Sequence, residues 1–454
     1  MKVTVFGGAG EIGGNQILLE GRESKIFLDF GKNFARESRY FEDPYLIPRK
    51  PQQLYELGLL PNLPGLYPWQ EEEPEIAGIL LSHAHLDHMD YARYTKQEIP
   101  LWAGEGTWSV IFAREIIGRR KEEERLAKFE DRGSVPFYKC FAQYRPNLMN
   151  FRTGREVKVG EFTVRPVHVD HSILASYGFV LEGPEGKISY TGDLRFHGPK
   201  NFSEDFLKEA EGCDVLIMEG TNVLESRPFS EGEVREKVEK IVTKTKGLVA
   251  TSFASMDIDR LRTFFEVADK HGRILVLSTR QAVLLEYIRQ EIEKGPVDFP
   301  FKLGDPRVKI YGKEKENSKW EQKLKSLYET VNSSWVSQNQ EKVLLFATYY
   351  DMLELLSIKP NPGSVFIYSE SEPLNEEGEI EFEKLENWLE LLGMPMFHVH
   401  ASGHASSLEL AEMVERLSPK KVIIVHCERP MLFKKFLKTR AEVICPERGK
   451  TIHL

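Results

Sequence analysis

The densest group of chemically capable residues is the run HAHLDH at residues 83–88, directly after an expected buried strand. Burying four side chains that can bind a metal, with no cation to hold them, would be costly. In an extended turn, His83 and His85 can converge on one ion. Asp87 and His88 can then turn toward a second ion. Imidazole and carboxylate ligands suit Zn²⁺ best, with Mn²⁺ or iron as alternatives, and a surface histidine patch is the less favoured interpretation.

Three more candidate ligands each follow an expected strand: His171, Asp193 and His426. Loops at the carboxyl ends of neighbouring strands can meet in one cleft. A single histidine in such a place would more often be structural, but several with the same placement favour a metal site. His168 and His197 remain, and we expect both to lie beside the ligands or on the surface.

The surrounding elements change character along the chain. The first part alternates short strands with glycine-rich turns, and a GxGxxG match at 8–13 leads into a second strand, which indicates a hairpin and not a dinucleotide site. Residues 31–75 form a long irregular segment, and such segments are usually functional or packed on a neighbour. From about residue 201, strands alternate with helices, a rhythm typical of a parallel sheet.

Composition excludes several classes of protein. The chain has 454 residues, 41% hydrophobic and 29% charged, which suits two or three globular domains. The net charge of −9 argues against binding nucleic acid over the whole surface. Four scattered cysteines predict no disulfide framework and no cysteine-bound zinc. Without an apolar stretch of membrane length or a signal-peptide pattern, we expect a cytoplasmic protein with no membrane partner.

HAHLDH is similar to the HxHxDH signature of the metallo-β-lactamase fold, and further motifs follow in that family's order. For the metallo-β-lactamase fold, these further motifs are Asp29 in IFLDFG, His171 and Asp193. Glu219 in MEGTN, His404 in HASGHA and His426 in VHCE then resemble motifs A, B and C of the β-CASP nucleases. The resemblance covers nearly the whole chain and is strongest to the RNase J branch, in the short form of its archaeal members.

The resemblance implies an α/β fold, namely a four-layer αββα metallo-β-lactamase fold with an inserted β-CASP domain. The metallo-β-lactamase domain would comprise residues 1–205 and 365–454. The β-CASP domain, a parallel βαβ sheet, would occupy residues 206–364. A substrate channel would run between the two domains.

The resemblance also implies roles for individual residues. His83, His85 and His171 would hold one ion, Asp87, His88 and His426 the other, and Asp193 would bridge them. Asp29 would orient a ligand histidine. His404 would act as general acid, with Glu219 keeping it protonated. Ser402 and Gly403, at the start of a capped helix, would seat a phosphate; His400 either contacts that phosphate or packs in a strand.

Four further residues have two interpretations each. Arg260 and Arg280 either line an RNA channel or lie on the surface, and the surface is slightly favoured. Trp102 and Trp108 either stack on bases or pack in the core, and core packing is the default.

The predicted function is a two-metal phosphodiester hydrolase acting on single-stranded RNA, first as a 5′-to-3′ exoribonuclease and alternatively as an endoribonuclease. Two Zn²⁺ ions are the expected cofactors, with Mn²⁺ as the alternative, and a homodimer is suggested by family analogy. A DNA 5′ exonuclease is a competing prediction, although such relatives typically carry valine where His426 stands. A small-ester hydrolase would need neither the inserted domain nor His404. A non-catalytic RNA-binding scaffold would have lost metal ligands that this chain retains.

Overall fold

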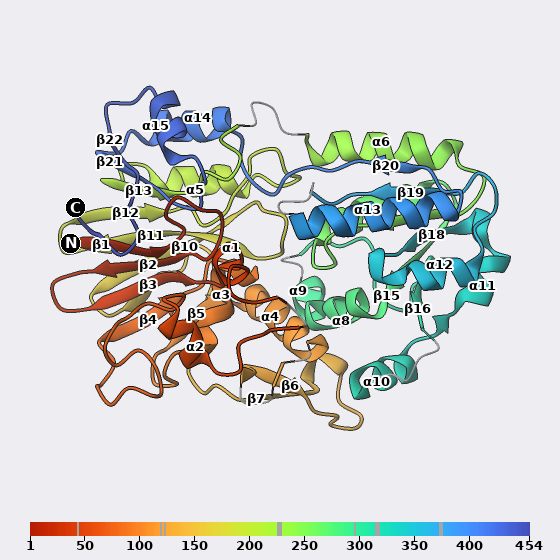
Figure 1. Cartoon of the computed structure of the whole chain (residues 1–454), viewed down its shortest axis with the longest axis horizontal. Coiled ribbons are helices and arrows are strands. Elements are labelled where there is room, and N and C mark those ends of the chain that lie inside the picture. Colours follow the sequence, from red (N-terminus) through yellow and green to blue (C-terminus); the bar gives the residue numbers. More distant parts are fainter. Residues whose placement is uncertain are drawn as a thin grey trace.

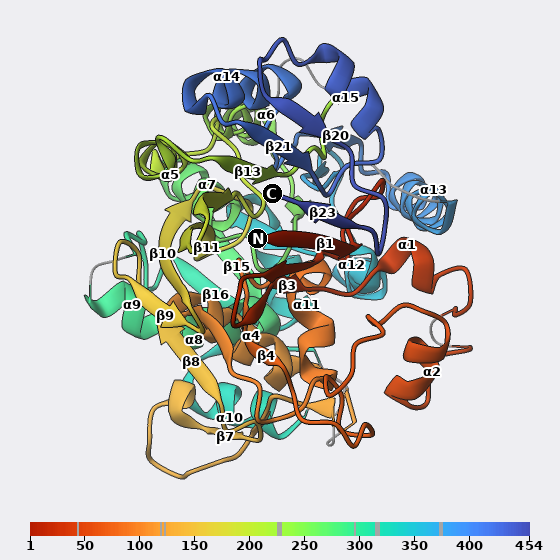
Figure 2. The same ribbon diagram turned by 90° about the vertical axis from the view of Figure 1, so that its left-hand side faces the viewer.

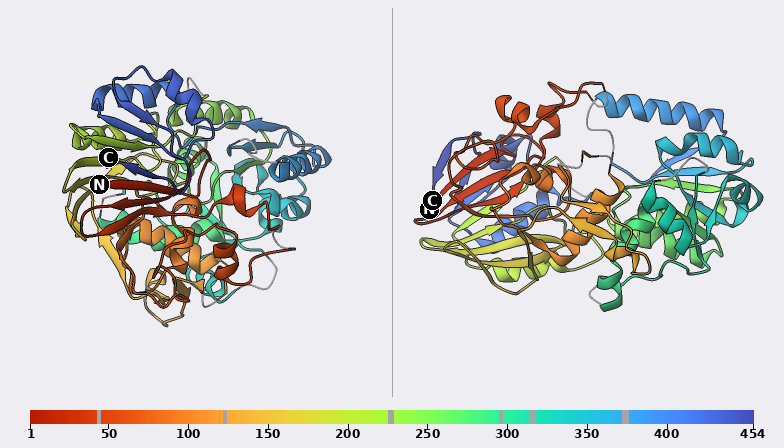
Figure 3. Two further views of the ribbon diagram at one scale, coloured as in Figure 1. Left: turned by 60° about the vertical axis from the view of Figure 1, so that its left-hand side comes forward. Right: turned by 90° about the horizontal axis from the view of Figure 1, so that it is seen from below.

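The computed structural model describes residues 1–42, 45–118, 120–121, 124–224, 229–294, 297–313, 318–371 and 376–454. The chain forms two lobes, one built on two stacked sheets and the other on a third sheet (Figure 1). Figure 3 shows the same two lobes end to end, joined along the middle of the molecule. No helix within the described ranges combines the length and apolar character that crossing a membrane requires.

The first sheet has seven strands and carries the chain's beginning and end. Its last strand, β23, pairs with β1, so the two termini lie side by side (Figure 2). The order across the sheet is β23 (Thr451–His453), β1 (Lys2–Gly7), β2 (Gln16–Glu20), β3 (Lys25–Phe30), β4 (Ile76–Leu80), β5 (Leu101–Gly104) and β8 (Leu148–Phe151). As the sequence predicted, β1 and β2 form an antiparallel hairpin around the GxGxxG segment.

The second sheet packs face to face on the first. Its order is β22 (Glu442–Ile444), β21 (Lys421–Ile424), β13 (Val215–Met218), β12 (Gly186–Tyr190), β11 (Ser176–Gly183), β10 (Phe162–Val169) and β9 (Val157–Val159). Alternate side chains from both sheets, such as Val5, Leu28, Phe179 and Ile217, are fully buried in one apolar core. Burial of this apolar surface is the main force holding the two sheets together.

Helices cover the outer face of each sheet and complete four layers. On the second sheet lie α5 (Phe202–Ala210), α14 (Ser407–Leu417) and α15 (Pro430–Phe436), which share a core with it. On the first lie α2 (Pro51–Glu56), α3 (Leu86–Met89), the 3₁₀ helix η1 (Asp90–Tyr94) and α4 (Glu105–Ile117). The predicted four-layer arrangement is therefore confirmed.

The third sheet is parallel throughout, as the alternating pattern predicted. Its order is β17 (Thr330–Val331), β16 (Val308–Tyr311), β15 (Ile274–Ser278), β18 (Val343–Phe346), β14 (Val249–Ser252), β19 (Val365–Tyr368) and β20 (Met396–His398). One face packs on α6 (Glu231–Lys244), α7 (Ile258–Lys270) and α8 (Thr279–Tyr287), and the other on α11 (Ser333–Gln338), α12 (Met352–Ile358) and α13 (Glu376–Leu391).

The remaining elements are short and lie in connections between strands. They are α1 (Phe34–Glu37), the small sheet of β6 (Ala127–Phe129) and β7 (Phe141–Gln143), α9 (Arg289–Lys294), α10 (Lys319–Leu327), and the 3₁₀ helices η3 (Phe137–Lys139), η4 (Gln340–Lys342) and η5 (Tyr349–Asp351). The irregular segment 31–75 thus contains α1 and α2, and it is anchored by Leu54 and Tyr67, which are buried in the core.

The inserted lobe has different boundaries from those expected. Strand β13 lies in the second sheet, so the chain leaves that lobe between β13 and α6, later than residue 205. Strands β19 and β20 lie in the third sheet with α13 beside them, so the chain returns after β20 and not at residue 365 (Figure 1). A short apolar strand has the same local pattern in either sheet, so its sequence does not reveal which sheet it joins.

Candidate metal centre

The predicted metal ligands converge on the carboxylate of Asp193, which is buried after strand β12. From its Oδ2 atom, the Nε2 atoms lie at 3.0 Å for His88, 3.7 Å for His426, 3.8 Å for His83 and 4.0 Å for His171. Two ligands of one ion, each about 2 Å from it, lie at comparable separations. The Asp193 carboxylate is therefore placed where it can bridge two ions.

One group of ligands is made only of histidines. His83 Nε2 and His171 Nε2 lie 3.0 Å and 3.1 Å from His85 Nδ1. Burial lowers the pKa of His85 to about 3, and burial likewise holds the pKa values of His83 and His171 well below the ordinary range. Neutral imidazoles keep the lone pair that a metal needs.

The other group combines two histidines with a carboxylate. Asp87 Oδ2 lies 3.2 Å from His426 Nε2 and 3.8 Å from His88 Nε2. His88 also stands in a triplet with His83 and Asp193 whose ligand atoms all lie within 4.8 Å of one another. His88 therefore belongs to both halves of the cluster, whereas the sequence-based expectation assigned it only to the second ion.

The cluster fits divalent cations. Within the described residues, His88 Nε2 and Asp193 Oδ1 are buried and have no hydrogen-bond partner. Buried polar atoms are almost always partnered, and His88 Nε2 lies within the cluster, 3.0 Å from Asp193 Oδ2. Histidine nitrogens with carboxylate oxygens are a donor set that Zn²⁺ prefers. Cations at this place would give these two atoms the partners that hydrogen bonds do not supply.

Asp29 holds one of the ligands in place. Its Oδ2 lies 2.7 Å from His88 Nδ1 and accepts hydrogen bonds from the hydroxyls of Ser82 and Tyr190 at 2.7 Å and 2.6 Å. The Ser82 amide donates to its other oxygen at 2.7 Å. Asp29 adopts φ = 58°, which non-glycine residues rarely do. Such strain is tolerated where surrounding contacts fix the residue, as they do here.

Three groups that orient the ligands were not predicted from the sequence. Thr221 Oγ1 lies 2.8 Å from His426 Nδ1, and the Gly403 carbonyl lies 2.5 Å from His171 Nδ1. Tyr190 is the third, through Asp29. Partners of this kind fix the tautomer and direction of a metal-binding imidazole. Thr221 lies inside the MEGTN motif, which was the one signal that could have identified it.

We expect Tyr190→Phe to weaken metal binding without removing any ligand. The change deletes the hydroxyl that donates to Asp29 and accepts from Asn15 Nδ2 at 3.0 Å. Loss of such a support typically costs about 10- to 100-fold in metal affinity. Competition with a coloured zinc chelator measures the effect, with Tyr177→Phe as a control for loss of a buried tyrosine hydroxyl. Equal metal affinities in the Tyr190→Phe and Tyr177→Phe variants would contradict the supporting role of the Tyr190 hydroxyl.

The glycine-rich hairpin loop packs directly against the ligands. A Cβ on Gly13 would lie 2.8 Å from Asp87 Oδ2, and Gly13 has φ = +77°. The Gly8 carbonyl accepts a hydrogen bond from the His426 amide at 2.8 Å. The glycines therefore serve close approach of the loop to the cluster, and not the binding of a dinucleotide.

His404 lies at the open edge of the cluster and pairs with Glu219. Its Nδ1 is 2.9 Å from Glu219 Oε2 and 3.9 Å from Asp193 Oδ2. Its side chain is 20% exposed, whereas that of Glu219 is fully buried. Burial favours the neutral imidazole, but the carboxylates of Glu219 and Asp193 outweigh it and raise the pKa of His404 to about 9. A protonated imidazole here can donate a proton at neutral pH.

Part of the expected phosphate seat already takes part in hydrogen bonds within the protein. Ser402 Oγ accepts from Asn222 Nδ2 at 2.7 Å and from the His404 amide at 3.2 Å, and the Ala405 amide donates to a carbonyl. These amides are thus already used inside the protein. His400 is half-buried with Nδ1 3.3 Å from the Ser369 carbonyl, and burial lowers its pKa to about 4.

Arg260 is fully buried, so its favoured placement on the surface is wrong. Its guanidinium donates to Glu231 at 2.8 Å and to the Ala401 carbonyl at 3.3 Å. Arg195, also fully buried, donates to Glu231 at 3.2 Å and to the Ser402 carbonyl at 3.3 Å. The two arginines therefore connect α6 of the inserted lobe to the segment that carries His404, and neither lines a channel.

The remaining candidates lie outside the metal cluster. The His168 ring packs between Tyr177 and Phe202, with centroids at 4.3 Å and 5.2 Å. His197 lies 3.2 Å from a Glu409 carboxylate oxygen. Trp108 is buried and donates a hydrogen bond to the Met149 carbonyl. Trp102 packs against the core between the two sheets. Arg280 is exposed.

Comparisons with known proteins agree with this geometry. Residues 57–235 match the family model of the beta-lactamase superfamily domain. Residues 394–446, which include His404 and His426, match the Zn-dependent metallo-hydrolase RNA specificity domain. A solved structure, a protein of unknown function from Enterococcus faecalis V583, shares the fold with a TM-score of 0.75 at 21% identity, covering 100% of this chain and 99% of that one.

Curated relatives named ribonuclease J align along almost the whole chain. The protein from Helicobacter pylori strain J99 is 25% identical over 94% of this chain, which spans only 56% of that relative's length. The archaeal relatives from Pyrococcus abyssi and Methanocaldococcus jannaschii are 28% and 26% identical over 95% and 94% of this chain, and 91% of each relative is covered.

Proposed function

We propose an RNA-cleaving function for this chain, which belongs to the β-CASP branch of the metallo-β-lactamase family and is RNase J-like. The proposed reaction is hydrolysis of phosphodiester bonds in single-stranded RNA by a two-metal centre holding Zn²⁺, with Mn²⁺ as the alternative. The observation that carries the proposal is a full set of buried ligands around Asp193 with the His404–Glu219 pair beside it.

The chain's own residues supply positioning and a proton. Bound cations would neutralise charge on the phosphoryl oxygens and lower the pKa of the attacking water. Asp193 balances part of the cations' charge. His404, protonated and partly exposed, donates its proton to the leaving oxygen of the RNA. Glu219 keeps His404 charged and fixes the direction of its ring through the 2.9 Å contact.

The proposed direction of attack is 5′-to-3′ exonucleolytic, with endonucleolytic cleavage as the alternative. A single-stranded RNA with a 5′-monophosphate, 5′-triphosphate or 5′-hydroxyl end distinguishes the two. Mononucleotides released from the 5′-monophosphate RNA alone support the exonuclease. Internal fragments that form regardless of the chemical group at the 5′ end support the endonuclease. A matched DNA strand tests the DNA 5′ exonuclease.

The non-catalytic scaffold and the homodimer can each be tested directly. RNA binding without cleavage in the presence of Zn²⁺ or Mn²⁺ would support a non-catalytic scaffold, against which the complete ligand set argues. The homodimer is proposed by family analogy, and sedimentation of the purified protein tests it. An RNA substrate is consistent with the expected cytoplasmic location.

We expect Glu219→Gln to shift the pH dependence of cleavage toward lower pH. A general acid works only when protonated, so activity is lost as the pH rises through the pKa of His404. The Glu219 carboxylate raises that pKa, and the neutral amide does not. The alkaline limb of the kcat profile should therefore move down in pH, while the rate well below it changes less. An unshifted alkaline limb would contradict the role of Glu219.

A further inference from the structure

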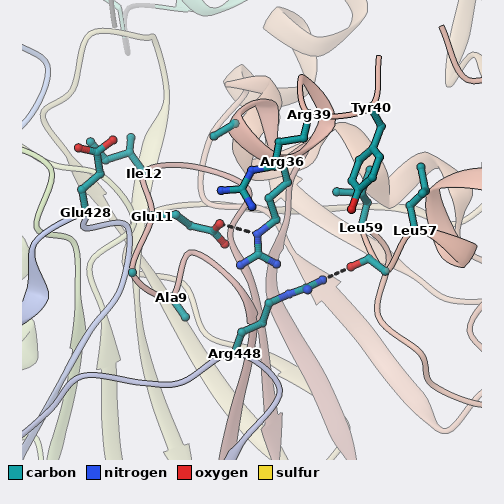
Figure 4. Close-up of a pocket in the computed structure, with 13 residues that line it drawn as sticks. Ala9, Glu11, Ile12, Arg36, Arg39, Tyr40, Leu57, Leu59, Glu428 and Arg448 are labelled. Atoms are coloured by element: carbon teal, nitrogen blue, oxygen red, sulfur yellow. Dashed lines mark hydrogen bonds and ion pairs between the residues drawn. The ribbon is translucent and has the colours of Figure 1, made fainter. Parts of the chain in front are cut away.

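A cavity is lined in part by the glycine-rich loop whose ends contact the candidate metal ligands. It has a volume of about 570 Å³, within the usual range of small-ligand pockets. Its walls come from the glycine loop at 9–12, from the segments 35–40 and 57–59, and from Glu428 and Arg448 near the end of the chain (Figure 4). Two of these segments belong to the irregular region 31–75, to which the proposed catalysis assigns no role.

Three guanidinium groups gather in this cavity, those of Arg36, Arg39 and Arg448 (Figure 4). Arg36 Nε donates to Glu11 at 2.6 Å. No carboxylate among the described residues forms an ion pair with Arg39 or Arg448. Burial and the nearby charge of Arg36 lower the pKa of Arg448. The cavity thus holds more positive charge than its own carboxylates balance.

Two of the arginines are fixed in place, and the side chain of the third forms no hydrogen bond or ion pair with the residues that the structure describes. Arg448 Nε donates to the Phe6 carbonyl at 2.7 Å, and its Nη2 donates to the Gly58 carbonyl. Arg36 is held by Glu11, and its side chain is only 18% exposed. Arg39 is exposed. Guanidinium groups match phosphate oxygens in geometry and charge, so such a cradle suits a phosphate.

An aromatic ring stands next to the arginines. Tyr40 lines the same cavity and is 50% exposed (Figure 4). Proteins that bind single strands combine positive charge for the backbone with aromatic rings on which bases stack. The arginine cradle with Tyr40 therefore suits a nucleotide better than an isolated inorganic anion.

The cavity shares one wall with the metal cluster. Ala9, Gly10, Glu11 and Ile12 face the cavity, while the loop's ends contact the ligand residues. The Asn15 amide donates to the Asp87 carbonyl at 2.9 Å, and the Gly8 carbonyl accepts from the His426 amide. Glu428, two residues after His426, also lines the cavity. The same loop therefore contacts both the metal cluster and the arginine cavity.

We propose that this cavity binds a nucleotide of the same single-stranded RNA whose cleavage occurs at the metal cluster, through the phosphate cradle of Arg36, Arg39 and Arg448 and base stacking on Tyr40. The proposal rests on the RNA substrate of the proposed function. It predicts that strands long enough to reach both places bind more tightly than a dinucleotide, which occupies the metal cluster alone.

The test compares Arg39→Glu with Arg440→Glu, which makes the same charge change at an exposed arginine outside the cavity. Binding of a fluorescent 15-nucleotide RNA is measured in a His404→Ala background, so that the RNA stays intact. We expect Arg39→Glu to weaken binding about tenfold, because it removes a charged hydrogen bond, and to reduce its salt dependence. Tyr40→Ala should weaken binding with an unchanged salt dependence, and Arg440→Glu should stay within about twofold of its parent.

Cleavage assays on forms that retain His404 separate this proposal from the proposed function. Arg39→Glu should lower kcat/KM for the 15-nucleotide RNA and leave cleavage of a dinucleotide unchanged. Equal binding by the Arg39→Glu and Arg440→Glu variants overturns the proposal even if RNA is cleaved. Weaker binding of AMP but not of RNA by Arg39→Glu also overturns it, in favour of a free-nucleotide site. RNA binding that depends on Arg39, with no cleavage by any form of the protein, would support nucleotide binding in the cavity and contradict the proposed nuclease function.

Discussion

Replacing His404 with alanine should lower kcat for RNA cleavage by about 10²- to 10⁴-fold, the usual contribution of a positioned general acid. His404 lies next to the cluster, 3.9 Å from Asp193 Oδ2, and Glu219 holds its Nδ1. Alanine removes the proton donor and leaves the three-histidine group and the Asp87 group complete. We therefore expect the metal content per chain to be unchanged, as measured by elemental analysis after gel filtration.

The metal measurement decides between two roles for His404. Its ring nitrogen also falls within a potential ligand group with Asp193, Glu219 and His426. Loss of one metal ion in His404→Ala would show that this residue is a ligand and not the acid. The matched control is His271→Ala, another histidine beside a carboxylate, 3.5 Å from Glu239 in the inserted lobe. That variant should retain full activity.

Replacing Asp193 with asparagine should abolish binding of at least one metal ion and lower activity by more than about 10³-fold. The Oδ2 atom of Asp193 is 3.0 Å from His88 Nε2 and 3.7 Å from His426 Nε2. Asparagine preserves the shape but removes the negative charge that would offset two dications. Losing even one electrostatic donor in an active site costs about 10²- to 10³-fold, and the Asp193 carboxylate lies beside histidines of both ligand groups.

Asp214→Asn is the matched control for this change. Asp214 lies at the start of β13 in the same sheet, where its carboxylate pairs with Lys420 at 2.7 Å. The control should bind metal and cleave RNA like the parent. A fully loaded and active Asp193→Asn protein would contradict the bridging role. Circular dichroism on all variants confirms that the chain remains folded.

The candidate metal ligands could be selected from the sequence because their residue types and positions are encoded locally. HAHLDH places four donors in one turn, and His171, Asp193 and His426 each follow a strand. Strand ends meet at a sheet edge whatever the details of packing, so residue type and position in the element were sufficient. The structure brings all of these side chains together around the Asp193 carboxylate.

The groups that orient those ligands were decided by tertiary structure. Tyr190 is 161 residues from Asp29 in sequence, and the Gly403 carbonyl is 232 residues from His171. Contacts between such distant segments depend on how sheets and lobes pack, and no local pattern records them. The same reason explains the shifted lobe boundaries and the burial of Arg260. Its charge favours a surface position unless a buried carboxylate, here that of Glu231, pairs with it.

The sequence by itself determined the donor set, the strand-end placement of the ligands, and the presence of a parallel inserted sheet, because these follow from periodicity and from side-chain chemistry. The tertiary structure alone decided which atoms face one another. It alone also brought Arg36, Arg39 and Arg448 into one cavity, since Arg448 reaches that place from the opposite end of the chain. Charge spread along a sequence becomes a binding site only when folding brings it to one point in space.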